Sequence, residues 1–325
     1  MKAELLQHNN DDLFIANVAR ASFAKWHDTF TMRSDVGPDE KSDEGLVHYL
    51  ANHKHISPFF HPRFTFEVEH NQWMEFMRDS DLTDLMGFVW EQYSQDTFIV
   101  RGSFYGWVKF LARYDSWVIA NALVKTLPVA SQAYGLQYVD GAEIDDYWFS
   151  RQYDSPRFID ASFRLTMPIF VARQMFTHRM FATNEVSRRY VTDELEFFPP
   201  DVWRAKPEGS IKQGSSDKPV EFLIDKDGDI ADIKTFYGVY SEYANEAYKL
   251  MLDNHVAPEM ARMLLPQSMH TTVIFTGSLH DWAKVYHLRT DNHAQKEIKD
   301  LLHMVDAELS TTYGDLWTDA KARTT

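Results

Sequence analysis

Apolar residues recur in this chain with two different periods, and the segments that show them follow one another without regular alternation. Residues 61–69 alternate apolar and polar side chains, which is typical of a half-buried strand. Residues 233–248 place apolar side chains at helical spacing instead. Residues 162–167 and 271–276 are also strand-like. This mixture predicts an α+β fold, with a mixed sheet flanked by long helices, and not a doubly wound sheet.

Further segments have the end signals or the composition of helices. The pair Ser42-Asp43 is a typical N-terminal cap, and Pro168 suits the first turn of a helix that continues into Arg173. Helices are expected over residues 11–25, 43–52, 107–111, 117–127, 278–288 and 291–311.

The bulk composition limits the partners of the chain. At 325 residues and 44% hydrophobic content, the chain can bury a sizeable core. No apolar run reaches membrane-spanning length, and the opening residues MKAELLQHNNDD are too polar for a signal peptide. A formal net charge of −15 disfavours binding to a nucleic acid polymer. We therefore expect a cytoplasmic protein that does not bind membranes and whose anionic ligands are small.

The chain contains no cysteine. Disulfides, thiolate nucleophiles and cysteine-ligated metals are therefore excluded. Histidines occur at 53, 55, 61, 287 and 293, but no HExxH spacing accompanies them. No metal site is predicted.

One short run concentrates positive charge in this acidic chain. The run RQMFTHRMFATNEVSRRY, at 173–190, holds four arginines and a histidine against the single acid Glu185. Such side chains repel one another unless an anion lies between them. Arginine also suits phosphates and planar bases, because its guanidinium donates a fixed fork of hydrogen bonds. The run therefore suggests a phosphate pocket; a solvated helix face followed by a basic loop is the alternative.

Two distant segments resemble each other. TFIVRGSFYGWVKFLARYD starts at Thr97, and TVIFTGSLHDWAKVYHLRTD starts at Thr272. Each has an apolar strand, then Gly-Ser, then Trp and Lys two residues apart. With so few shared residues, a common strand–turn–helix pattern is preferred over a true duplication.

The basic run also carries a family resemblance. THRMFATNEVSRRY, at 177–190, resembles the signature RHRxxSxNExSxRY of the flavin-dependent thymidylate synthases, with Thr177 and Ala182 departing from the pattern. Five further segments resemble the family in the same order: ARASF at 19–23, HKHISPFFHPRFTFEVE at 53–69, MPIFVARQ at 167–174, APEMARMLLP at 257–266 and LRTDNHAQKEI at 288–298.

The resemblance implies roles for particular residues. Arg289 would be catalytic and would pair with the uracil of dUMP. The other dUMP-binding residues would be Gln174, Glu185, Ser187, Arg188, Arg189 and Arg262. The FAD-binding residues would be Ser57, Thr177, His178, Arg179, Met180, Asn184, Ser278, His280 and Lys284. Arg188 stands where glycine is common, and Ser278 and Lys284 stand where asparagines are usual.

The resemblance also implies an activity and an architecture. The activity is methyl transfer to dUMP, giving dTMP, with bound FAD, NADPH as reductant and methylenetetrahydrofolate as one-carbon donor. The lack of cysteine fits this route, which needs no enzyme nucleophile. Residues 1–325 would form one domain of the thymidylate synthase-complementing fold, with a helical, aromatic-rich insertion at about 71–160. The implied assembly is a homotetramer with shared active sites, in the host cytoplasm if the chain is encoded by a phage.

Two alternatives remain open at this point. The departures at Thr177 and Ala182 could accompany flavin-dependent hydroxymethylation of dUMP or dCMP. A metal-dependent nucleotide hydrolase that uses the histidines is an alternative from another class.

Overall fold

The computed structural model describes residues 1–6, 10–37, 40–81, 88–139, 155–192, 195–207, 216 and 218–324. Its strands are β1 Lys2–Leu6, β2 Arg63–Glu69, β3 Val89–Gln92, β4 Thr97–Ser103, β5 Asp160–Pro168, β6 Ala182–Glu185, β7 Phe222–Ile224, β8 Ile230–Asp232 and β9 His270–Ser278. Its α-helices are α1 Asp12–Ala21, α2 Asp43–Asn52, α3 His70–Asp79, α4 Phe104–Leu111, α5 Trp117–Thr126, α6 Pro128–Ala133, α8 Ile169–Met175, α9 Ile233–Asp253, α10 Pro258–Ala261, α11 Leu279–Thr290, α12 Lys296–Tyr313 and α13 Asp315–Ala322. Three short 3-10 helices complete it: η1 Arg33–Asp35, η2 Ser57–Phe60 and η3 Arg262–Leu264.

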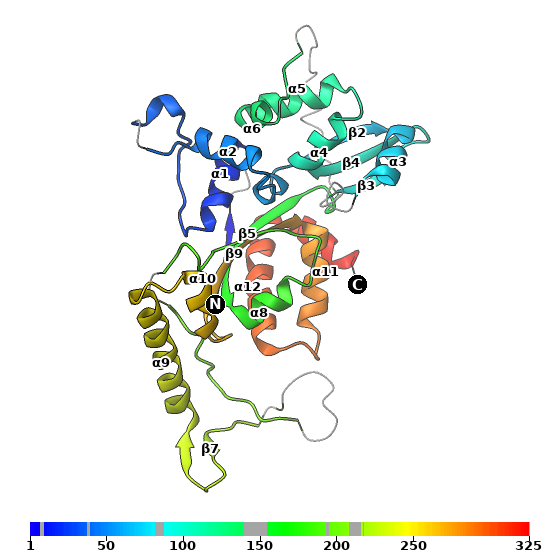
Figure 1. Ribbon diagram of the computed structural model, residues 1–325. Coiled ribbons are helices and arrows are strands. Elements are labelled where there is room, and N and C mark those ends of the chain that lie inside the picture. Colours follow the sequence, from blue (N-terminus) through cyan, green and yellow to red (C-terminus); the bar gives the residue numbers. More distant parts are fainter. Residues whose placement is uncertain are drawn as a thin grey trace.

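The α+β class is confirmed, but the pairing within the sheets differs from the expected mixed sheet. A four-stranded sheet has the order β1-β5-β9-β6, a three-stranded sheet has the order β2-β4-β3, and β7 pairs with β8 (Figure 1). Every strand pair in the described part of the chain is antiparallel. The physical reason lies in β9. β5 and β6 run in the same direction, but β9 lies between them and pairs antiparallel with both.

The two faces of the four-stranded sheet are covered differently. On one face, Phe163 and Phe275 pack with Trp282 and with the apolar sides of α12 and α13. On the other face, Ile274 packs with α1. This second face also carries buried polar groups, because Thr276 Oγ1 is 2.7 Å from His61 Nδ1 and 2.6 Å from Ser162 Oγ. A polar core on the η2 side is a suitable base for a binding site.

Most of the predicted elements occur, with shifted ends. Ser42 caps α2 by accepting a hydrogen bond from Gly45 N, as its sequence predicts. Pro168 is the N-cap of α8 and not its first helical residue. The aromatic-rich segment contains helices α3 to α6, but it also contains β3 and β4, so "helical" describes only part of it. Residues 82–87 and 140–154 of that segment lie outside the described residues.

The similarity between the segments at 97 and 272 extends to whole structural units. We call β2, α3, β3, β4 and α4 the first unit, and β5, α8, β6, β9 and α11 the second unit. Both have the same chain order and the same strand order, β2-β4-β3 and β5-β9-β6. Gly102 is paired with Phe64 in the first unit, and Gly277 with Ala161 in the second. The strands therefore correspond residue by residue.

The two units also share their tertiary hydrogen bonds. Trp107 Nε1 donates to Phe64 O at 3.0 Å, and Trp282 Nε1 donates to Ala161 O at 3.0 Å. Each of these carbonyls belongs to the residue paired with the unit's glycine. Ser103 and Ser278 both cap the following helix through the side-chain oxygen. A common local pattern would not reproduce these long-range contacts, so the structure favours duplication.

Each unit requires a glycine at its centre. A methyl group at Gly277 would overlap the ring of Phe181, and one at Gly102 would overlap Phe88. We expect Gly277→Ala to lower the free energy of unfolding by about 1–3 kcal/mol, because a well-packed core resists added volume. Urea denaturation measures this loss. In a Phe181→Ala background the same substitution should cost less than half as much; an equal cost in both backgrounds would show that the ring is not the obstacle.

The units are joined by a buried ion cluster. Arg101 Nε donates to Asp160 Oδ2 at 2.8 Å, and Arg63 Nη1 lies 3.5 Å from Asp160 Oδ1. Arg63 is 2% exposed and Asp160 is 6% exposed. Both arginines belong to the first unit and the carboxylate to the second, so this cluster connects the two units.

Candidate functional site

The basic run follows α8 and continues into the edge strand β6. α8 ends at Met175, where Phe176 N donates to Ala172 O, and the chain then turns through Thr177 and His178. β6 pairs with β9, so that Asn184 lies opposite Ile274. Residues of the run are therefore held by the central strand of the sheet while their outer side remains accessible.

Arg289, near the C-terminal end of α11, reaches this turn. Its Nε donates to His178 Nε2 at 3.0 Å. Its Nη2 donates to Thr177 Oγ1 at 2.9 Å and to Gln174 O at 3.3 Å. The structure thus brings together four of the predicted site residues. Thr177, which stands where the signature has arginine, accepts a hydrogen bond from Arg289 here.

The geometry fixes the protonation of His178. Because Arg289 donates to Nε2, the ring must carry its proton on Nδ1 and remain neutral. Burial, reinforced by the charge of Arg289, lowers the pKa of His178 from 6.5 to about 4. At neutral pH the guanidinium is therefore the charged member of the pair.

This pKa shift predicts a pH-dependent stability. Between about pH 4 and pH 6.5 the unfolded chain binds a proton at His178 that the folded chain does not. The free energy of unfolding should therefore rise with pH across this window. His178→Gln removes the titrating group, so the stability difference between wild type and variant should shrink as the pH falls. Urea titrations at several pH values test this; parallel curves for the two proteins would contradict it.

The remaining predicted dUMP residues form a second group. Arg189 Nε lies 3.4 Å from Glu259 Oε2, which places Arg189 beside α10, and Arg262 follows α10 directly as an exposed side chain. Ser187 N is anchored by Ser22 O at 3.0 Å. Glu185 Oε1 accepts a hydrogen bond from Thr271 Oγ1 at 2.7 Å. A single chain therefore presents the Arg289 group and the Arg189 group as two separately organised sets.

Several predicted flavin residues lie near η2. Exposed Ser57 opens η2, which packs against β6. Met180 O is 3.4 Å from Arg63 Nη2, which donates to it. Among the described residues, Asn184 Oδ1 is buried and accepts no hydrogen bond. A buried carbonyl oxygen without a donor is costly, so a ligand donor beside β6 would satisfy it.

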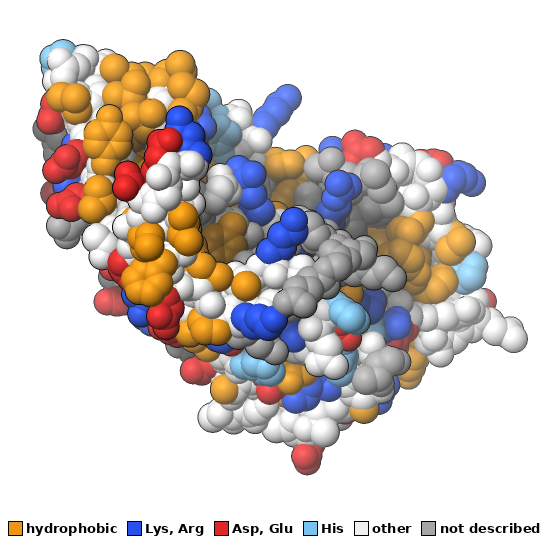
Figure 2. Space-filling model, turned by 90° about the horizontal axis from the view of Figure 1, so that it is seen from below, with side chains coloured by type: hydrophobic (Ala, Val, Ile, Leu, Met, Phe, Trp, Pro, Cys, Tyr) orange, Lys and Arg blue, Asp and Glu red, His pale blue; other side chains and the backbone are white. Residues whose placement is uncertain are grey.

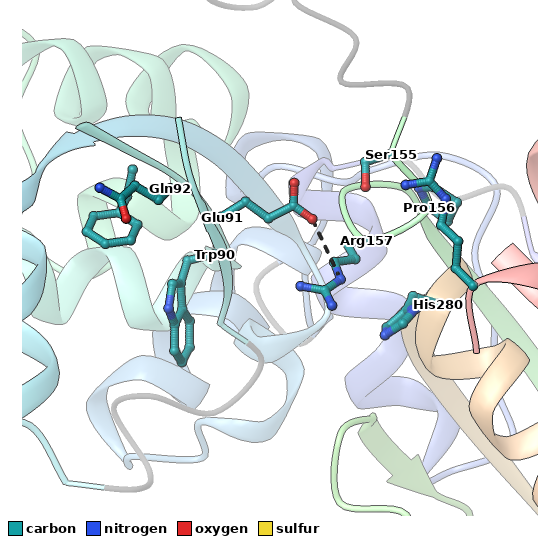
Figure 3. A pocket seen from close by; sticks show the side chains of 9 residues that line it. Trp90, Glu91, Gln92, Ser155, Pro156, Arg157 and His280 are labelled. Carbon is teal, nitrogen blue, oxygen red and sulfur yellow. Dashed lines mark ion pairs between the residues drawn. The ribbon is translucent and has the colours of Figure 1, made fainter. Parts of the chain in front are cut away.

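The other three predicted flavin residues lie elsewhere. Ser278 is buried and bonded to Asp281, as the cap of α11. His280 lies at the start of α11, nine residues and about 14 Å along the helix from Arg289. It lines a cavity of about 530 Å³ between the two units, whose other walls are Trp90, Glu91, Gln92, Phe98, Ser155, Pro156, Arg157 and Arg323 (Figure 3). Lys284, one turn further along, is exposed.

Sequence reasoning did not assign the residues of this cavity to any site. Burial together with the charges of Lys284 and Arg157 lowers the pKa of His280. Arg157 Nε lies 3.6 Å from Glu91 Oε1, across the cavity wall. One signal was present in the sequence: Ser155-Pro156 before β5 repeats Ser57-Pro58 before β2.

Charge is distributed unevenly over the surface. Figure 2 shows Lys and Arg side chains gathered over the middle of one face of this acidic protein. In the described ranges, no three His, Asp or Glu side chains are grouped as metal ligands. The hydrolase alternative therefore has no supporting cluster there. Nor does any described helix combine the length and apolar character needed to cross a bilayer.

Comparisons with known proteins identify relatives. The family model described as thymidylate synthase complementing protein matches residues 4–78 and 120–312. A flavin-dependent thymidylate synthase of Aquifex aeolicus is 29% identical over 319 residues, 90% of this chain and 92% of that protein. Proteins of the same description from Treponema denticola and Thermus thermophilus are 33% and 34% identical, over 50% and 49% of this chain. The chain matches 59% and 56% of their lengths.

A solved structure described as a UMP/dUMP methylase, PolB of Streptomyces cacaoi bound with 5-Br UMP, is 17% identical. The match covers 99% of this chain and 94% of that chain, with a TM-score of 0.45.

Proposed function

The chain belongs to the thymidylate synthase complementing protein family, and from this premise we propose that it is a flavin-dependent thymidylate synthase that methylates dUMP to give dTMP. The observation that carries the proposal is the Arg289 group. A signature-bearing turn, a neutral histidine and a partly buried guanidinium meet at one place, where Arg289 Nε lies 3.0 Å from His178 Nε2. This is a suitable arrangement for stabilising negative charge on a pyrimidine.

We assign binding of the nucleotide to both basic groups. Arg289 would face the uracil, with Gln174 beside it. Glu185, Ser187, Arg188, Arg189 and Arg262 would hold the ribose and phosphate. Because one chain organises these residues as two sets, their joint use is best explained by active sites shared between subunits. The homotetramer expected from the resemblance supplies such an arrangement.

The residues beside β6 fit a flavin. Ser57, Thr177, His178, Arg179, Met180 and Asn184 would hold FAD, and the unsatisfied Asn184 Oδ1 would accept a hydrogen bond from it. When bound, the flavin supplies the reducing equivalents. The chain's own residues orient the pyrimidine and exclude water from it. NADPH as reductant, methylenetetrahydrofolate as one-carbon donor and a cytoplasmic location complete the proposal.

Product analysis tests the proposal. The purified protein is incubated with dUMP, methylenetetrahydrofolate and NADPH, and the nucleotides are identified by mass spectrometry. We expect a flavin absorbance spectrum and a product heavier than dUMP by one methylene group. A protein that binds no flavin after reconstitution, or leaves dUMP unchanged, would overturn the proposal. A hydroxymethylated nucleotide, from dUMP or dCMP, would instead establish the alternative product.

A further inference from the structure

Helix α4 of the first unit corresponds to helix α11 of the second. Both follow a Gly-Ser pair, and their first residues make the same bond, from Phe104 N to Pro62 O and from Leu279 N to Ile159 O, each at 2.8 Å. The correspondence pairs three residues of α4 and its cap with the three distant flavin candidates. In chain order, the pairs are Ser103 with Ser278, Tyr105 with His280 and Lys109 with Lys284.

The start of α11 does not face the signature strand. It faces the cavity whose opposite wall is β3. In the pairing with β4, β3 occupies the place that β6 occupies with β9: Trp90 lies opposite Val100, and Thr183 lies opposite Phe275. Glu91 and Gln92 are thus the counterparts of Asn184 and Glu185. A carboxylate at position 91, where β6 has a carboxamide, disfavours an anionic dinucleotide in this cavity.

The start of α4 lies on the signature side. α4 and β6 both pack against η2, the 3-10 helix that begins at Ser57. The Tyr105 ring lies 5.4 Å from the ring of Phe60 in η2. Lys109 lies four residues later on the same face of α4, and its Nζ is 5.8 Å from the Tyr105 ring centre. The strand with Asn184, the helix with Ser57 and this face of α4 therefore surround one place.

We propose that α4 supplies, within the same chain, the cofactor contacts that the family resemblance assigns to Ser278, His280 and Lys284. Lys109 would bind a phosphate of the dinucleotide, and Tyr105 would pack against one of its rings. Ser103 corresponds to Ser278, which is buried as a cap, and shapes the start of the helix. The inference rests on the proposed flavin dependence.

The internal duplication offers a matched pair of variants for the test. FAD affinity of the apoprotein is measured by titration of flavin fluorescence, with wild type, Lys109→Ala and Lys284→Ala in parallel. We expect Lys109→Ala to weaken FAD binding about tenfold or more, since a charge-assisted contact is worth roughly 1.5–3 kcal/mol. Lys284→Ala should change it less than twofold. The reverse order, or equal weakening by both substitutions, would overturn the inference.

Further measurements separate the two proposals and the effect of folding. If wild type binds no FAD at all, the proposed function fails before the position of the site is tested. If wild type binds FAD and only Lys284→Ala weakens it, the function stands and this inference fails. Tyr105→Phe and Tyr105→Ala give an independent test: the phenylalanine variant should keep most of the affinity, and the alanine variant should lose it. Thermal unfolding of each apoprotein shows whether a loss of affinity reflects a loss of structure.

Discussion

Replacing Arg289 by alanine should reduce dTMP formation by about a hundredfold or more. The guanidinium is held by His178 and Thr177, and because His178 is neutral, no other charge in this group replaces it. Removing one preorganised donor from an active site typically costs 10²–10³ in kcat. The rate of dTMP formation at saturating dUMP is the measurement. FAD should still bind, because the flavin residues beside β6 are unchanged.

Arg173→Ala is the matched control for charge. Arg173 belongs to the same basic run, but it is exposed on α8. Its removal changes the net charge by the same amount and should alter the rate less than threefold. If Arg289→Ala kept more than a tenth of wild-type kcat, Arg289 would not be the catalytic residue. A similar loss in both variants would point to the overall charge and not to the Arg289 group.

Replacing Asp160 by alanine should destabilise the protein by about 3–5 kcal/mol. Asp160 is the carboxylate between Arg63 and Arg101, and both Arg63 and Asp160 are buried. Without it, two guanidinium groups lose their counter-ion away from water, which is far more costly than the ion pair is favourable. Urea denaturation followed by circular dichroism measures the loss.

The position of Asp160 between the units sharpens this test. Asp79→Ala removes a carboxylate from an exposed pair with Arg78 in the same chain, and it should change stability by less than about 1 kcal/mol. Asp160→Asn keeps the shape and should lie between wild type and Asp160→Ala. If Asp160→Ala cost no more than Asp79→Ala, the cluster would not hold the two units together.

Local elements of this fold were predictable because they depend on near neighbours in the chain. α2 begins and ends where the Ser42 cap and the apolar spacing indicate, and β2, β5 and β9 follow their alternating patterns. β3 was missed because four residues with charged and amide side chains carry too little periodicity to be recognised. The direction of the sheet was also missed, since the insertion of β9 between β5 and β6 is a long-range event.

The site was predicted in part for the same reason. The signature run and Arg289 were identified from the sequence, and the structure brings Arg289 to Gln174, Thr177 and His178. The positions of Ser278, His280 and Lys284 could not be predicted. Two units with the same strand–Gly–Ser–helix pattern give the same local signal, so the sequence does not show which helix faces which strand.

By itself, the sequence determined the fold class, the exclusion of thiolate chemistry and the residues able to bind an anion in an acidic chain. Those properties follow from composition and from short-range spacing, which act before the chain is folded. Only the tertiary structure decided that α11 presents its start to β3 and its end to His178, and that α4 lies beside the signature strand. The physical reason is that packing between duplicated units depends on buried contacts such as Asp160 with Arg63 and Arg101, whose partners are distant in the chain.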